Sequence, residues 1–196
     1  MTIRLIPVLA LLTVAGCASS PPTRYFALDP VAPAAASGAD RAGGAGVPVK
    51  VDAVHIPPAL DRESMVRGES GNQLQISSQD RWAGDLGEMI RRVLTQDLAS
   101  RLPAGMVIAP QSPAPPKAHG LVVDILTFQP QAGEVVLDAD WTLLQGTQSN
   151  PVMRRSVHLT ASGASQAQDE AAAMSTLLGK LADDIAQNID NAHAPR

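Results

Sequence analysis

The sequence predicts an α+β fold in which one antiparallel sheet carries two amphipathic helices packed on one face. Three observations lead to this prediction. Four segments are apolar throughout or alternate apolar with polar residues, as strands do: 47–56, 121–128, 134–143 and 152–161. Two further segments, 77–102 and 174–189, repeat apolar residues at helical spacing. Each helical segment has a single apolar stripe, so both helices are expected to cover the same face of the sheet.

The chain opens with the anatomy of a lipoprotein signal peptide. Arg4 gives a positive start, and residues 5–14 form an apolar run too short to span a bilayer. Leu11-Leu12-Thr13-Val14-Ala15-Gly16-Cys17 resembles a bacterial lipobox, which implies cleavage before Cys17 and acyl and diacylglycerol groups on that residue. An ordinary secretory signal with a chance cysteine is the alternative. Ala18 is not the aspartate that holds lipoproteins in the inner membrane of enteric-type bacteria, so the expected location is the periplasmic leaflet of the outer membrane.

The charge of the chain limits the classes of partner. Lysine and arginine total 15 against 19 acidic side chains, which gives a formal net charge of −4. This balance argues against binding nucleic acid or an anionic leaflet by charge alone, so membrane attachment must come from the acyl chains. Cys17 is the only cysteine, and its acylation would leave neither a disulfide nor a cysteine nucleophile. The covalent lipid is the only prosthetic group expected.

The predicted domain organisation has four parts. Residues 1–16 are the signal peptide, and 17–46 hold the acylated cysteine, a short strand at Tyr25–Leu28 and a flexible segment rich in Ala, Pro and Gly. Residues 47–192 form a single α+β domain, and 193–196 are a tail. If the short strand joins the sheet, the tether from Cys17 spans at most about 20 Å. Otherwise it runs to Gly46, with a coil span of roughly 30 Å. Tyrosine and phenylalanine are scarce in this chain, so the pair Tyr25 and Phe26 is expected to pack into the domain, which favours the short tether.

The first half of the domain is expected to hold a strand, a hairpin and a helix. Pro57-Pro58 ends the strand at 47–56, and short strands flank a turn at 68–71. Ser77 with Asp80 can act as a capping box for the helix, which Pro103 closes. Its predicted apolar stripe is Trp82, Leu86, Met89, Ile90, Val93, Leu94, Leu98 and Leu102.

The second half is expected to hold an antiparallel meander and the second helix. Residues 121–128 are apolar on both faces, which predicts a central strand, and 110–117 before them form an exposed proline-rich loop. The alternation in 134–143 and 152–161 predicts two neighbouring strands with one face wet. The second helix has the stripe Met174, Leu177, Leu178, Leu181, Ile185 and Ile189.

Catalytic constellations are weak in this sequence. The four histidines, at 55, 119, 158 and 193, do not have the spacing of metal ligands. The better interpretation is that they are exposed to solvent or hydrogen-bonded within the protein. Asp138 and Asp140 share a strand face and could pair as acid and base, although such a pair is more often the wet face of a sheet. We therefore expect neither an enzyme nor a metal site.

Three further motifs resemble one known family. They are His55-Ile56-Pro57-Pro58-Ala59-Leu60-Asp61-Arg62, then Gly71-Asn72-Gln73-Leu74, then Asp80-Arg81-Trp82-Ala83. Together with Tyr25-Phe26-Ala27-Leu28 after the lipobox, their order and spacing resemble the ABC-type transport auxiliary lipoproteins, the PqiC (YmbA) family. Relatives tend to have proline where Glu63 stands and an acidic residue where Gly84 stands.

The resemblance implies a non-catalytic outer-membrane adaptor. It would dock against a periplasm-spanning MCE-type protein so that lipid can pass between the membranes, and Asp61, Arg62, Arg81 and Trp82 would contact that partner. A structural role fits these residues equally well, with Asp61 and Arg62 capping a turn and Arg81 and Trp82 fixing the start of the helix. Two other functions stay open: a carrier that binds phospholipid in an apolar cavity, and a structural lipoprotein that supports an outer-membrane barrel.

Overall fold

The structure is a computed structural model that describes residues 21–33, 46–68, 73–146, 150–163 and 165–193. Cys17 lies outside these ranges, as does most of the segment predicted to be flexible. The described elements, in chain order, are β1 (Arg24–Phe26), β2 (Val49–His55), β3 (Ser64–Gly68), β4 (Leu74–Trp82), α1 (Leu86–Arg101), β5 (Val107–Ile108), β6 (His119–Gln131), β7 (Glu134–Gln145), β8 (Asn150–Ser162) and α2 (Ala167–His193).

The α+β class is confirmed, but the prediction of one antiparallel sheet is wrong. The strands form a five-stranded sheet with the order β5-β2-β6-β7-β8 and a three-stranded sheet with the order β1-β4-β3. Both sheets are mixed, because β2 is parallel to β5 and β6, and β1 is parallel to β4. Parallel neighbours need a long crossover, and α1, which lies between β2 and β6 in the chain, supplies it.

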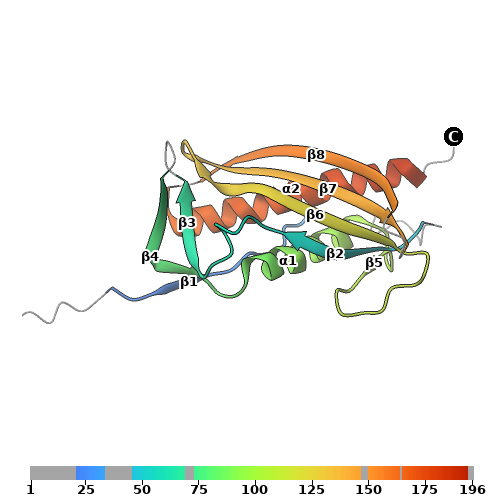
Figure 1. The fold of residues 1–196 in the computed structure, drawn as a ribbon, viewed down its shortest axis with the longest axis horizontal. Coiled ribbons are helices and arrows are strands. Elements are labelled where there is room, and N and C mark those ends of the chain that lie inside the picture. The colour runs from blue at the N-terminus through green and yellow to red at the C-terminus, as the bar shows by residue number, and fades with distance from the viewer. Residues whose placement is uncertain (1–20, 34–45, 69–72, 147–149, 164, 194–196) are drawn as a thin grey trace, which may run out of the picture.

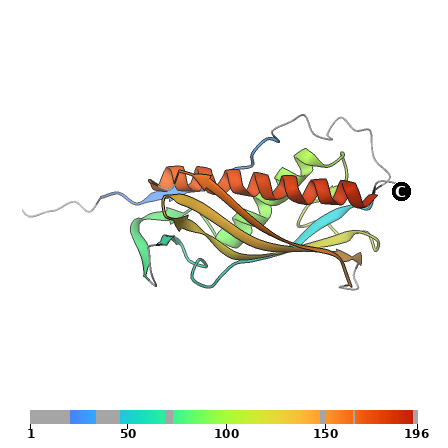
Figure 2. The ribbon, with the colours of Figure 1, turned by 90° about the horizontal axis from the view of Figure 1, so that it is seen from above.

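The five-stranded sheet and the two helices enclose the core. Figure 2 shows α1 and α2 on the same side of this sheet, as predicted. β6 is its central strand, and β6, β7 and β8 form the predicted antiparallel meander. The inward residues of β7 are all buried, namely Val135, Leu137, Ala139, Trp141 and Leu143. They pack in one core with the stripe of α2, where Met174, Leu177, Leu178, Leu181, Ile185 and Ile189 are also buried.

The start of α1 differs from the prediction. Residues 77–82 belong to β4, and the helix begins only after Asp85, whose carboxylate accepts a 2.8 Å hydrogen bond from the backbone N–H of Glu88. The hydroxyl of Ser77 still accepts a hydrogen bond of 3.0 Å from the Asp80 N–H. This is the contact that an N-cap residue makes at the start of a helix, but here both residues lie in a strand. Pairing of β4 with both β1 and β3 therefore overrides the local capping signal.

The two sheets give the domain distinct ends. Figure 1 shows β1, β3 and β4 together at one end, and β5 and the start of β8 at the other. The residues before β1 extend from the first end, so this is where the chain leads back towards Cys17. Within the described ranges, no helix has both the length and the hydropathy needed to cross a bilayer.

Candidate docking site

The turn between β2 and β3 presents two of the four predicted contact residues. The N–H of Leu60 donates to the carbonyl oxygen of Pro57 (2.9 Å), and the N–H of Arg62 donates to that of Leu60 (2.9 Å). Leu60 is buried, whereas Asp61 and Arg62 are exposed. The turn is thus fixed to the core by one apolar side chain and offers both charged groups to solvent.

The other two predicted residues hold this turn against β4. Arg81 forms an ion pair of 3.0 Å with Glu63, and the N–H of Trp82 donates to the Glu63 carbonyl oxygen at 2.7 Å. The Trp82 side chain is only 4% exposed, so its ring belongs to the core. The structure therefore brings Asp61 and Arg62 next to the Glu63–Arg81 ion pair and gives Trp82 an internal, structural role.

The segment after β1, which we name the strap (residues 28–31), joins the two helices. Leu28 is fully buried, and its carbonyl oxygen accepts a bond of 3.0 Å from the Arg92 guanidinium on α1. The N–H of Asp29 donates to the Ser175 hydroxyl on α2 at 3.1 Å. Asp29 follows the strand predicted at Tyr25–Leu28 and belongs to the segment expected to be flexible, but this hydrogen bond ties its backbone to α2.

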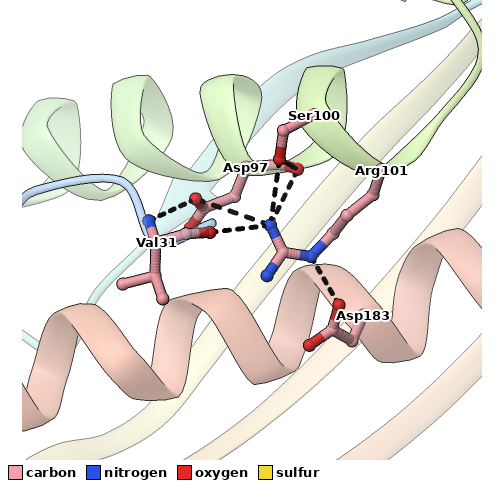
Figure 3. Close-up of polar contacts among 5 residues, drawn as sticks. All are labelled: Val31, Asp97, Ser100, Arg101 and Asp183. Carbon is pink, nitrogen blue, oxygen red and sulfur yellow. Dashed lines mark hydrogen bonds and ion pairs between the residues drawn. The ribbon is translucent and has the colours of Figure 1, made fainter. Parts of the chain in front are cut away.

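A buried charged cluster holds the end of the strap, as Figure 3 shows. The N–H of Val31 donates to Asp97 Oδ1 at 2.7 Å, and Arg101 Nη1 donates to the Val31 carbonyl oxygen at 3.0 Å. Arg101 Nε also donates to Asp183 Oδ1 on α2 at 2.6 Å. Gly179 on α2 allows the close approach, because a Cβ atom there would lie 3.1 Å from Val31 Cβ.

The charge of Asp97 is poorly compensated in this cluster. Its side chain is 1% exposed, and Oδ2 receives no hydrogen bond from any described residue. Burial raises the pKa of Asp97 to about 6, although the Val31 N–H and the Arg101 guanidinium, 3.6 Å away, both favour the ionised form. The end of the strap is therefore hydrogen-bonded to a carboxyl group whose pKa is raised by burial.

Two open depressions lie beside the small sheet and the edge of the large one. The first, of about 350 Å³, lies between β4 and the start of α2, with the Arg24–Asp80 ion pair (2.7 Å) and the Ser77 and Ser78 side chains in its wall. The second, of about 640 Å³, lies between the end of β8 and α2 and is lined mainly by small and polar residues, among them Gly163 and Thr176. Neither is an enclosed apolar chamber.

The face of the large sheet opposite the helices carries polar pairs across neighbouring strands. His55 Nδ1 lies 2.7 Å from Asp124 Oδ1, and His158 Nδ1 lies 2.5 Å from Asp138 Oδ1. The Ser156 hydroxyl donates to Asp140 at 2.5 Å. Asp138 and Asp140 thus have separate partners on β8, as expected for the wet face of a sheet.

No local sequence pattern reveals these pairs, because only the strand register brings their members together. In the described part of the chain, no group of three or more His, Cys, Asp or Glu side chains is placed to hold a metal ion.

Comparisons with known proteins give a family and a fold. Residues 26–186 match the family model described as ABC-type transport auxiliary lipoprotein component. A crystal structure of an uncharacterised protein is similar at 23% identity, covering 86% of this chain and 99% of that one, with a TM-score of 0.70. A protein from Xanthomonas campestris is similar at 16% identity over 84% and 93% of the two chains, with a TM-score of 0.67. No curated protein matches the sequence.

Proposed function

This chain belongs to the family of ABC-type transport auxiliary lipoprotein components, and we propose that it is the non-catalytic docking component of an MCE-type lipid transport system. In this proposal, acyl chains on Cys17 anchor it in the periplasmic leaflet of the outer membrane. Its partner is a periplasm-spanning MCE-type protein, and lipid passes between the two membranes through the assembly that they form.

The observation that carries the docking role is the charged turn at Asp61 and Arg62. Both residues are exposed, and the backbone bonds of the turn, the buried Leu60 and the Glu63–Arg81 ion pair hold them in place. A charged surface that is already ordered loses little conformational entropy when a partner binds, which favours specific docking. The turn leads into β3, which lies at the end of the domain from which the chain leaves before β1 (Figure 1).

The packing of the core favours an adaptor over a phospholipid carrier. A carrier needs an apolar cavity large enough for an acyl chain. Between the large sheet and the helices, the facing side chains of β7 and α2 are buried in one contiguous core. The two depressions described above are open and lined largely by polar groups.

Crosslinking in cells tests the docking role. A photo-reactive amino acid at Asp61 should trap the MCE-type protein, because this side chain is exposed and does not take part in the Glu63–Arg81 pair. Adding Arg62→Glu should abolish the crosslink by reversing a charge at the contact. Arg154→Glu is the matched control, because Arg154 is also exposed but lies on β8, and it should leave the crosslink intact. Crosslinks to phospholipid alone, or equal crosslinking in both variants, would contradict the proposal.

A further inference from the structure

We propose that β8 binds an extended, acidic segment of another protein, which adds a strand to the free edge of the five-stranded sheet. Addition of a strand to an exposed sheet edge is a common mode of peptide recognition, in which main-chain hydrogen bonds supply affinity and side chains supply specificity. The inference depends neither on the charged turn between β2 and β3 nor on the lipid anchor, and it adds a second interaction surface to the domain.

β8 is a long edge strand with one open side. Its 13 residues pair with β7 alone, whereas the other edge of the sheet is the two-residue strand β5. Figure 1 shows β8 along the upper border of the sheet. Every second residue of an edge strand directs its backbone N–H and C=O away from the sheet, so β8 offers about six such residues to a new strand. Among the described residues, the only bond from a β8 backbone group to a partner outside the sheet joins the Thr160 carbonyl oxygen to Lys180 Nζ, at 3.1 Å.

The side chains of β8 give this edge a positive charge. The strand contains two arginines and a histidine but no acidic residue, although the whole chain has a net charge of −4. Arg155 is exposed and pairs in register with the inward-facing Trp141, so its side chain lies on the face of the sheet that the helices cover. A carboxylate on an added strand would become its neighbour across the strands.

The acidic side chains near β8 have other partners. On the wet face, Asp138 and Asp140 are bound by side chains of β8. On the helix face, Asp184 accepts a hydrogen bond from Trp141, and within the described ranges Arg155 forms no ion pair with it or with any other acidic residue. Arg155 therefore offers an uncompensated charge at the open edge, and a carboxylate is its strongest hydrogen-bonding partner.

Charge selects an acidic strand over a second copy of this chain. Because β8 has no acidic residue, two copies of β8 side by side could form no ion pair between their side chains and would bring their arginines together. Like charges across neighbouring strands are unfavourable, and charged side chains on an edge are a common protection against self-association. The same charges favour a segment that carries carboxylates.

The space beside the end of β8 determines where the segment should be uncharged. The open depression of about 640 Å³ between the end of β8 and α2 gives room for side chains of an added strand. Small residues of α2 line it, namely Ala172, Ala173 and Thr176, and Glu134 and Asp169 also lie in its wall. The segment should therefore be acidic beside Arg155 and uncharged beside this depression.

Binding of a synthetic peptide to the full-length protein in detergent tests the occupant. The probe is fluorescein-labelled Ser-Thr-Val-Glu-Glu-Val-Thr-Ser, in which adjacent glutamates place one carboxylate on each face of an extended strand. A control peptide has two lysines in their place. Fluorescence anisotropy should show roughly fivefold tighter binding of the glutamate peptide, and Arg155→Glu should remove this preference. Lys117→Glu is the matched control, because Lys117 is exposed in the loop before β6, and it should leave binding unchanged.

A peptide methylated on its four central backbone nitrogens separates strand addition from attraction by charge alone. It keeps both glutamates but cannot donate the main-chain hydrogen bonds, so it should not bind. The unmodified peptide should slow hydrogen exchange of β8 amides. Equal binding of the methylated peptide, or slower exchange only outside β8, would overturn strand addition. No binding, or equal binding of the glutamate and lysine peptides, would overturn the acidic occupant. A dimer in sedimentation with β8 amides protected before peptide is added would assign the edge to a second copy instead.

Discussion

The indole Nε1 of Trp141 donates a 2.9 Å hydrogen bond to Oδ2 of Asp184, which joins the middle of β7 to α2. Trp141 is fully buried, and the other oxygen of the carboxylate accepts a bond of 3.2 Å from Asn188. Asp183 and Asp184 lie outside the apolar stripe predicted for the second helix, where solvated side chains are expected. Asp183 is exposed and accepts a hydrogen bond from the buried Arg101, whereas Asp184 is half-buried and accepts one from the buried Trp141.

Removal of the Asp184 acceptor should destabilise the fold. Asp184→Ala leaves the buried indole N–H without its partner, which should lower the free energy of unfolding by about 1 to 3 kcal/mol. Gln187→Ala is the control, because Gln187 is an exposed residue of the same helix and its change should stay within about 0.5 kcal/mol. Urea denaturation measures the stability of both variants. Equal transition midpoints for the two variants would show that the hydrogen bond between Trp141 and Asp184 does not stabilise the fold.

Leu94 tests the packing of α1 on the core. Its side chain is fully buried, so Leu94→Ala should lower the free energy of unfolding by about 2 to 5 kcal/mol through lost burial and a residual cavity. Leu126→Ala, at a side chain that is 60% exposed, should cost much less. If thermal melting gave the same midpoint for Leu94→Ala and wild type, the stripe of α1 would be a surface and not a core contact.

Arg101 is expected to hold the strap in place. Arg101→Met leaves the Asp97 carboxylate buried without a cation and the Val31 carbonyl without its donor, which should cost about 3 to 5 kcal/mol. The Val31 amide should also lose protection against hydrogen exchange. Arg91→Met removes a partly exposed ion pair with Glu88 on the same helix and should cost about 0.5 kcal/mol or less. Unchanged exchange at Val31 in Arg101→Met would show that the strap is held by other contacts.

Asp97 should give stability a pH dependence of unusual sign. Its pKa in the folded protein is about 6, above the ordinary 3.8, so the folded state binds this proton more tightly than the unfolded state. The contribution of Asp97 to stability is therefore fully present below about pH 4 and is lost as the pH rises to about 6 and above, a change of the order of 2 to 3 kcal/mol. Most carboxylates act in the opposite direction.

Comparison with Asp97→Asn isolates this contribution, because asparagine does not titrate. The free energy of unfolding of wild type minus that of the variant should fall between about pH 4 and 6 and stay constant above. Denaturation curves over this range measure the difference. A difference that stays flat with pH would mean that Asp97 does not titrate in this window.

The anchor prediction concerns Cys17. Cys17→Ser removes the residue that accepts the acyl chains, so the protein should move from the membrane fraction to the soluble periplasmic fraction. Fractionation with antibody detection measures this change. A variant that stayed fully in the outer membrane would show that another surface of the protein is sufficient for attachment.

Local patterns predicted the elements whose partners are also local or repetitive. The alternation of β7 and the stripe of α2 gave their buried residues correctly, because burial on one face repeats with the period of the element. The predicted start of α1 was wrong because the chain carries two capping signals, at Ser77 and at Asp85. Each of these side chains accepts a hydrogen bond from the backbone N–H three residues later. Pairing with β1, more than 50 residues away in the chain, decides between them.

The strap and the parallel strands depended on contacts that no local pattern reports. Asp29 and Val31 bind residues of α1 and α2 that lie far along the chain. Alternation in β2 is the same for parallel and antiparallel neighbours, although α1 between β2 and β6 was a usable sign of a parallel crossover. Arg62 and Trp82 were both predicted as partner contacts from the sequence. Only tertiary packing shows that the Arg62 side chain is exposed whereas the Trp82 ring is buried.

The parallel pairing of β1 with β4 also determines how the domain bears mechanical load. In the proposed function, a partner that moves relative to the membrane would pull on the chain before Arg24, along the axis of β1. Force in this direction shears the hydrogen bonds between the two strands together, instead of breaking them one after another. Behind them, the bonds of Arg92 and Arg101 to the strap form a second point of resistance. Under tension, the lifetime of the attached β1 depends on the rate at which these contacts break, because forced unfolding is governed by the unfolding rate.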